Sequence, residues 1–234
     1  MDRRILCVRH EADPTDDRIT AWCAAHGIRA DIRRPYLGDA LGGITDDLAG
    51  VVVYGGTYNA YDSDKHPFLT EEYRMIDATM QAQVPLLGLC QGAQMIAHHM
   101  GAFAGAPAHG SHEFGYYEVT PTDAGQDLLP QPMHFTQAHF HTFDIPGGAT
   151  HLARSALFDN QAFAVDDHVM AFQFHPEQTI PGFQRWQDRG ADWGRYEEPG
   201  VQDRAEQTRL MHAHDAAQHD WFMAFLDRYF GGAA

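Results

Sequence analysis

Short apolar runs alternate with amphipathic stretches through the first hundred residues of this chain. Buried strands are predicted where short apolar runs stand, at 5–8, 51–54 and 85–89, and a further strand is predicted over 28–32. Apolar residues recur at helical spacing in three places, predicting a helix that ends at Gly27 and others over 67–83 and 91–100. Strands and helices that alternate in this way predict a mostly parallel sheet with helices on both faces.

The second half of the chain has a different pattern. Strands are predicted over 113–120 and within 163–174, with a turn at Pro146-Gly147-Gly148, so partly antiparallel strands extend the parallel sheet. A helix is predicted over 202–230, with four candidate buried anchors: Leu210, Trp221, Phe222 and Phe225. No repeat or Ser/Gly linker divides the chain, and we expect a single domain over 1–234 with a helical extension at about 200–230. Three tryptophans suit core packing or docking: Trp186, Trp193 and Trp221.

Composition narrows the range of partners. Sixteen Lys and Arg face 32 Asp and Glu, a formal charge of −16 that repels phosphate backbones and anionic lipids, so nucleic acid and membrane are not expected as partners. The apolar run at the start is far shorter than a signal peptide, and no stretch reaches the roughly 20 apolar residues that cross a bilayer. The three cysteines show no disulfide-like spacing, which favours reduced thiols and a cytoplasmic location.

Candidate chemistry begins at Gly88-Leu89-Cys90-Gln91-Gly92, where a cysteine stands between a predicted strand and a predicted helix. A nucleophile on such a tight turn adopts strained backbone angles, and glycines two positions away on each side make room for neighbouring backbone. The helix that starts here favours the thiolate. By itself Cys90 could equally be a small buried apolar residue, which is our interpretation of Cys7 and Cys23.

A thiol nucleophile needs a base, and the base needs an orienting group. His175-Pro176-Glu177 offers both, because in a strand that runs through His175 residues two apart project to the same side. The carboxylate would then hold the imidazole tautomer. In a chain with 16 histidines the triplet alone fits an exposed loop as well, and the Cys90 turn gives it weight.

The stretches 88–94 and 173–177, preceded by Tyr54-Gly55-Gly56-Thr57, resemble class I glutamine amidotransferases. The similarity is strongest to stand-alone members that look like the glutaminase domain of GMP synthase, and it runs in order from about Val51 to Glu177. It implies a flavodoxin-like three-layer α/β/α fold and no cofactor. It also implies that Cys90 is the nucleophile, His175 the acid/base and Glu177 its partner.

The same resemblance suggests further site residues. It implies that backbone N–H groups of Gly56 and Gln91 form an oxyanion hole, with Gly55 as the alternative donor, and that Gln94 contacts substrate. A glycine loop after one strand and the residue after the nucleophile can aim two donors at one oxyanion. Without the Cys90 turn, an ordinary strand-ending turn and a solvated helical glutamine would explain these residues.

One loop departs from the family pattern. The stretch His139-Phe140-His141 precedes Thr-Phe where relatives usually read histidine, glycine, aspartate, so Phe140 and His141 are expected to narrow or reshape the substrate pocket. His134, His139 and His141 also raise the possibility of a metal site. Because no carboxylate or cysteine accompanies them at matching spacing, we expect surface or packing roles and no metal.

Three functions are consistent with this sequence. The first is glutamine hydrolysis through a γ-glutamyl thioester. Fewer than sixty residues follow Glu177 and no Gly-x-x-x-x-Gly-Lys loop is present, so either a separate synthase subunit receives the ammonia or the enzyme acts as a simple amidase. The second is hydrolysis of a γ-glutamyl amide or peptide by the same Cys90, His175 and Glu177. The third, a non-catalytic regulatory subunit, is disfavoured because all three residues are intact.

Overall fold

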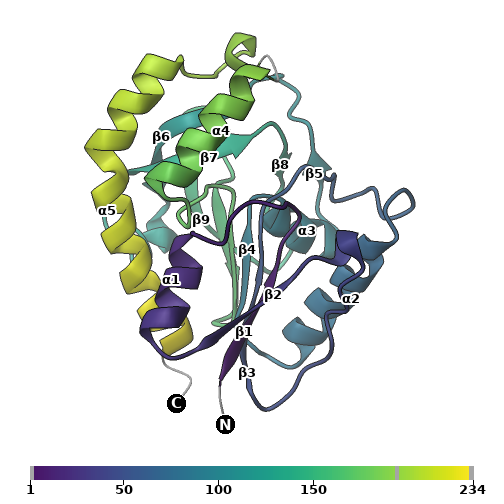
Figure 1. Ribbon diagram of the computed structural model, residues 1–234. Coiled ribbons are helices and arrows are strands. Elements are labelled where there is room, and N and C mark those ends of the chain that lie inside the picture. The colour runs from purple at the N-terminus through teal and green to yellow at the C-terminus, as the bar shows by residue number, and fades with distance from the viewer. Residues whose placement is uncertain (1–2, 193–194, 232–234) are drawn as a thin grey trace.

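A computed structural model describes residues 3–192 and 195–231 (Figure 1). Within them a nine-stranded sheet has the order β2-β1-β3-β4-β11-β10-β9-β6-β7. Its first five strands pair in parallel. They are β1 (Arg4–Val8), β2 (Arg29–Arg33), β3 (Leu48–Val53), β4 (Leu86–Leu89) and β11 (Val169–Phe172). Their order is the 2-1-3-4-5 order of flavodoxin-like folds, which confirms the predicted fold class.

The remaining strands of the sheet pair antiparallel, as the second half of the sequence predicts. They are β10 (Ala162–Val165), β9 (Thr150–Ser155), β6 (Glu113–Pro121) and β7 (Met133–His139). A separate antiparallel pair joins β5 (Ala104–Gly105) to β8 (Thr142–Phe143). Three short 3-10 turns, η1 (Pro35–Leu37), η2 (Asp123–Gly125) and η3 (Arg195–Glu197), complete the connections in the described ranges.

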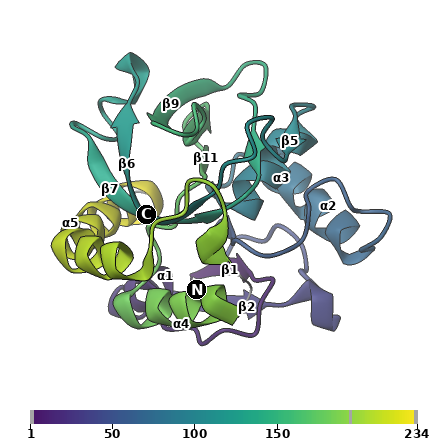
Figure 2. The same cartoon turned by 90° about the horizontal axis from the view of Figure 1, so that it is seen from above.

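Helices cover both faces of the parallel strands (Figures 1 and 2). On one face lie α1 (Arg18–Ala25) and α5 (Arg204–Gly231), and on the other lie α2 (Phe68–Gln81) and α3 (Gln91–His99). The alternation of side chains along β3 explains the two cores: Val52 packs towards α1 and α5, whereas Val51 and Val53 pack towards α2 and α3. The sheet is therefore the middle of three layers.

The C-terminal helix α5 is part of the core. Leu210, Phe222 and Phe225 are buried as predicted, whereas the fourth predicted anchor, Trp221, is only partly buried. The Tyr229 hydroxyl lies 2.9 Å from the carbonyl of Leu86 and 2.6 Å from that of His168. Trp193, by contrast, lies outside the described residues. None of the helices in the described ranges has both the length and the apolar character needed to cross a lipid bilayer.

One local expectation needs correction. Strand β11 ends at Phe172, so the strand does not run through His175. The backbone N–H of His175 instead donates to the carbonyl of Thr136, 2.8 Å away, and Pro176 has no N–H with which to continue a ladder.

Helix α4 (Ile180–Asp192) was not predicted from the sequence. Gly182 and Gly190 weaken its helical pattern, but its N-terminal signals are present. Pro181 lies in the first turn, and the Thr179 hydroxyl accepts a hydrogen bond from the N–H of Gly182 at 3.3 Å.

Candidate active site

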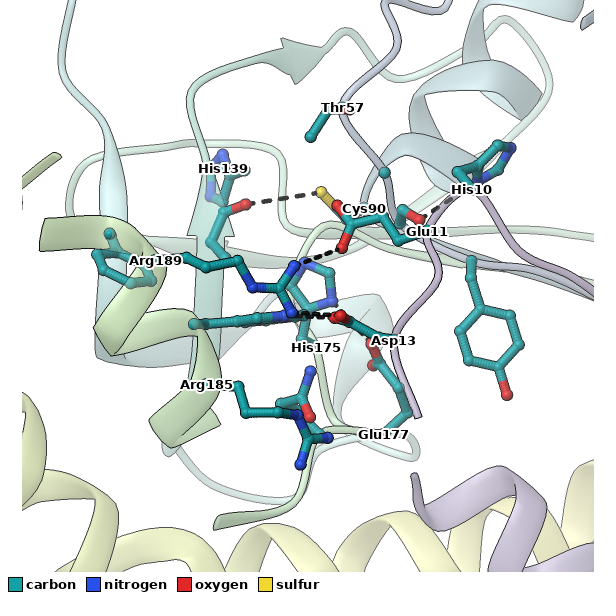
Figure 3. Close-up of a pocket in the computed structure, with 18 of the residues that line it drawn as sticks. His10, Glu11, Asp13, Thr57, Cys90, His139, His175, Glu177, Arg185 and Arg189 are labelled. Atoms are coloured by element: carbon teal, nitrogen blue, oxygen red, sulfur yellow. Dashed lines mark hydrogen bonds and ion pairs between the residues drawn. The ribbon is translucent and has the colours of Figure 1, made fainter. Parts of the chain in front are cut away.

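The candidate site is a cavity of about 400 Å³ at the carboxyl ends of the parallel strands (Figure 3). Cys90 directly follows β4, and Gly55 lies two residues past β3. His10 lies two residues past β1, and His175 three past β11. Neighbouring parallel strands end at the same edge of a sheet, so residues distant in sequence line one cavity there.

The turn at Cys90 has the strain that its sequence predicts. Cys90 has φ 50° and ψ −105°, and its N–H donates to the carbonyl of Phe172 at 2.7 Å. A Cβ atom at Gly92 would lie 2.0 Å from the carbonyl oxygen of Val53, and one at Gly88 would lie 2.8 Å from the nitrogen of Ala93. Both glycines are therefore required by backbone contacts, and the Cys90 thiol stands at the N-terminus of α3, at the positive end of the helix dipole.

His175 and Glu177 form a buried pair beside Cys90. The Nδ1 atom of His175 lies 2.8 Å from Oε1 of Glu177, and the ring also interacts with the Cys90 side chain. Burial lowers the pKa of His175, but Glu177 and Cys90 together outweigh burial and raise the pKa to about 10. An imidazolium is consequently favoured next to the sulfur at neutral pH.

Arg18, near the N-terminus, holds the segment that carries Glu177. The Arg18 guanidinium donates to the carbonyl of Pro176 at 2.9 Å and to a carboxylate oxygen of Asp215, on α5, at 2.6 Å. The Arg18 N–H donates to the carbonyl of Glu177, also at 2.9 Å. Helices α1 and α5 thus hold this segment although it has left the sheet.

The Gly55-Gly56 turn lies against the Cys90–His175 pair. A Cβ atom at Gly55 would lie 2.7 Å from Cε1 of His175 and 3.3 Å from Cβ of Cys90. Gln91 is the first residue of α3, so its backbone N–H lies at the helix terminus. Its side-chain oxygen accepts a hydrogen bond from the N–H of Tyr58 at 2.9 Å.

The predicted substrate residues divide into two groups. Gly55, His139 and Phe140 line the cavity, together with Gly56 and the Cys90, His175 and Glu177 side chains. Gln91, Gln94 and His141 are not among the described residues that line it. The Gln94 amide is buried and donates to the Gln173 side chain at 3.1 Å and to the His141 carbonyl at 3.4 Å, so it ties α3 to the loop after β7.

His139 belongs to a buried polar network. Its Nε2 lies 2.9 Å from Glu113, and its Nδ1 lies 2.9 Å from the carbonyl of His141. Ser155 and Gln161 also donate to the Glu113 carboxylate, at 2.6 and 2.8 Å. Glu113 and His139 face each other in the β6–β7 register, which the sequence could not disclose. His134 instead stacks on His214, and no group of three or more His, Cys, Asp or Glu within 3–192 and 195–231 could hold a metal ion.

Sequence reasoning missed one wall of the cavity, which α4 forms against the loop after β1. The Trp186 ring meets the His175 ring edge-on with centroids 4.7 Å apart. Arg189 pairs with Glu11 at 3.2 Å and with Asp13 (Figure 3). Burial raises the pKa of Glu11, and Asp13 raises it further, against the opposing effect of Arg189.

One turn earlier on α4, Arg185 makes a two-pronged contact with Asp16 at 2.6 and 3.0 Å. The spacing of Arg185 and Arg189 was the signal in the sequence that could have indicated this wall, because residues four apart share one helix face. Without the helix boundaries, however, that face could not be assigned.

Comparison with known proteins identifies the family. The model described as glutamine amidotransferase class-I matches residues 14–184, most of the chain. The chain belongs to the class-I glutamine amidotransferase family. This membership confirms the resemblance inferred from the 88–94 and 173–177 motifs.

Individual relatives agree with this family assignment. The glutamine amidotransferase-like protein YfeJ of Salmonella typhimurium is 30% identical over 189 residues, 76% of this chain and 77% of YfeJ. The GMP synthase of Neisseria gonorrhoeae is 28% identical over 141 residues, 56% of this chain but only 24% of the synthase. A crystal structure of a Thermotoga maritima glutamine amidotransferase, 24% identical, superposes with a TM-score of 0.86 over 98% of this chain and 99% of that one, which supports the fold.

Proposed function

We propose that this protein hydrolyses the side-chain amide of glutamine through a γ-glutamyl thioester on Cys90. The observation that carries the proposal is the strained Cys90 turn at the N-terminus of α3, with the buried His175–Glu177 pair beside it. A cysteine so placed is activated by both the helix terminus and an imidazolium. Membership of the glutamine amidotransferase family supports glutamine as the substrate.

The proposed reaction uses groups already described. The Cys90 thiolate attacks the amide carbon, a C–S bond forms, and the N–H groups of Gly56 and Gln91 stabilise the oxyanion. His175 then gives its proton to the amide nitrogen, the C–N bond breaks and ammonia leaves. In the second half His175 takes a proton from water, which attacks the thioester, and glutamate is released with the thiolate restored. Glu177 orients the ring throughout.

The substrate-binding assignments belong to this proposal. Gly55, His139 and Phe140 would contact the substrate directly, since they line the cavity. Gln94 and His141 do not line the cavity and would support its wall, because the Gln94 amide donates to the carbonyl of His141 at 3.4 Å. No step of the proposed mechanism requires a cofactor or metal.

A separate synthase subunit is the proposed ammonia acceptor. The name of the Neisseria gonorrhoeae GMP synthase describes it as glutamine-hydrolyzing, and this chain covers 24% of that protein. A cytoplasmic location is also part of the proposal and rests on the three unpaired cysteines, Cys7, Cys23 and Cys90.

The size and lining of the cavity favour a second candidate, a γ-glutamyl amide with a larger leaving amine. About 400 Å³ lies within the range of pockets for drug-sized ligands, whereas glutamine has ten non-hydrogen atoms. Phe114, Phe140 and Trp186 add aromatic surface to the same cavity. The thioester chemistry at Cys90 would be unchanged, and an amine would leave in place of ammonia.

Product analysis tests the proposal. Wild-type protein, Cys90→Ala and the control Cys23→Ala would be incubated with glutamine and with γ-glutamyl amides of increasing size, and ammonia, amine and glutamate measured. We expect ammonia from glutamine with wild type and Cys23→Ala, and none with Cys90→Ala. Amine release alone would favour the second candidate. No turnover of any substrate, together with no labelling of Cys90 by diazo-oxo-norleucine, would favour a regulatory subunit.

A further inference from the structure

The peptide that joins Gly55 to Gly56 has a partner outside the catalytic residues. The carbonyl oxygen of Gly55 lies 3.3 Å from Nδ1 of His10, at the end of β1. In a trans peptide the carbonyl and the following N–H lie in one plane and point in opposite directions. A contact that fixes the Gly55 carbonyl therefore also fixes the direction of the Gly56 N–H.

The glycine pair lies between His10 and the catalytic residues. A Cβ atom at Gly56 would lie 2.4 Å from Cβ of His10, whereas one at Gly55 would lie 2.7 Å from Cε1 of His175. Two adjacent glycines have more backbone freedom than any other pair of residues. An N–H group that serves as an oxyanion donor needs a fixed direction, so the restraint must come from a neighbour.

His10 is itself held from α2. Its Nε2 lies 2.8 Å from Oε2 of Glu72, and neither side chain is exposed (0% for each). Both ring nitrogens of His10 therefore face oxygen acceptors, the Glu72 carboxylate and the Gly55 carbonyl. The Gly55 carbonyl can only accept, so its contact is a hydrogen bond when the His10 ring carries a proton on Nδ1.

The main contribution of the His10–Glu72 pair is not to the free energy of folding. A buried pair of polar groups loses its contacts with water, and even a fully ionised buried pair is often no more stabilising than an apolar pair of equal volume. A directed N–H at Nδ1, however, is something an apolar pair cannot supply. The pair touches the Gly55-Gly56 turn through that N–H.

We propose that His10 is a positioning residue that sets the Gly55–Gly56 peptide so that the Gly56 N–H is presented to the oxyanion, and that Glu72 holds the His10 ring. This inference rests on the proposed hydrolysis at Cys90. It also selects Gly56, and not Gly55, as the donor.

Two replacements of His10 separate positioning from stability. In His10→Asn the amide nitrogen takes the place of Nδ1 and can still donate to Gly55, but it cannot reach Glu72. In His10→Gln the amide nitrogen takes the place of Nε2 and can bind Glu72, but Gly55 loses its donor. If His10 acts by positioning, kcat is higher for His10→Asn than for His10→Gln. If His10 acts only through stability, His10→Gln has both the higher thermal midpoint and the higher kcat.

The measurements are kcat and KM for the preferred amide, the thermal midpoint, and the rate at which iodoacetamide alkylates Cys90. Loss of an oxyanion donor costs about 10²–10³-fold in kcat, so we expect kcat of His10→Gln to fall at least about tenfold below that of His10→Asn. KM and the alkylation rate should match wild type in both variants, because Cys90 and His175 are untouched.

Glu72→Gln serves as the conservative control. Its amide can donate to Nε2 of a neutral His10, which keeps its proton on Nδ1 for Gly55, so kcat should stay within a few-fold of wild type. If kcat in an active enzyme follows the thermal midpoint through all three variants, the positioning role is wrong and the proposed hydrolysis stands. If wild type hydrolyses no amide, both are wrong.

Discussion

The two halves of the sheet contribute to the site in different ways. The parallel strands β1, β3, β4 and β11 all end at the cavity, where the Gly55-Gly56 turn follows β3 and the strained Cys90 turn follows β4. The antiparallel strands and α4 contribute a wall that depends on side chains, such as the Glu113–His139 pair and the Arg189–Asp13 pair. Backbone geometry thus places the residues at the strand ends, whereas side-chain contacts shape the cavity that a substrate would enter.

The strongest test of this contrast is Gly92→Ala. The new Cβ would lie 2.0 Å from the Val53 carbonyl oxygen, and a strand backbone cannot move aside without breaking its ladder. We expect the free energy of unfolding to fall by about 3 kcal/mol or more, with loss of turnover. Urea unfolding measures the change, and Gly147→Ala, where nothing lies within 4 Å, is the matched control with little effect. Equal stability of the two variants would refute the close-packed turn.

The next largest effect separates the roles within the His175–Glu177 pair. We expect His175→Gln to lower kcat by about 10²–10⁴-fold, because the proposed proton carrier is lost. Glu177→Gln should cost less, since an orienting carboxylate contributes less than the base it orients. Steady-state kinetics with a saturating amide would measure both, and a larger defect at Glu177 would contradict the role assignment.

A smaller effect is expected at the α4 wall. Trp186→Leu removes the ring that contacts the His175 imidazole edge-on, and we expect kcat/KM to fall roughly tenfold through a looser base and a wider cavity. Trp221→Leu is the control: its indole donates to the Leu128 carbonyl, and it packs in the core next to Phe135. That variant should lose stability but keep its kcat/KM, and similar kinetic defects in both variants would remove α4 from the site.

A separate effect on stability is expected from pH. The pKa of His175 is about 10 in the folded protein, above the ordinary value near 6.5 of an unfolded chain. The protonated ring therefore stabilises the fold fully below pH 6.5, and this stabilisation is lost as the pH rises towards 10. Urea unfolding of wild type and His175→Gln at pH 6, 8 and 10 should show a difference that shrinks with pH. A constant difference would contradict the raised pKa.

Much of the parallel half could be predicted from the sequence because its signals are local. The apolar runs at 5–8, 51–54 and 85–89 match β1, β3 and β4, and the spacing of Gly88 and Gly92 around Cys90 implied the strained turn that φ 50° confirms. The prediction that His175 lies on a strand failed, since a local alternation rule does not register the hydrogen bond from its N–H to Thr136, on a strand far earlier in the chain.

The sequence alone determined the class of fold, the turn at Cys90 and the family motifs, because each depends on residues within a few positions of one another. Only the tertiary structure decided that His10 and Glu72 reach the Gly55 carbonyl, that Glu113 faces His139 and that α4 closes over His175. Those contacts join elements whose registers and crossing points are set by packing of the whole sheet, and no local pattern encodes them.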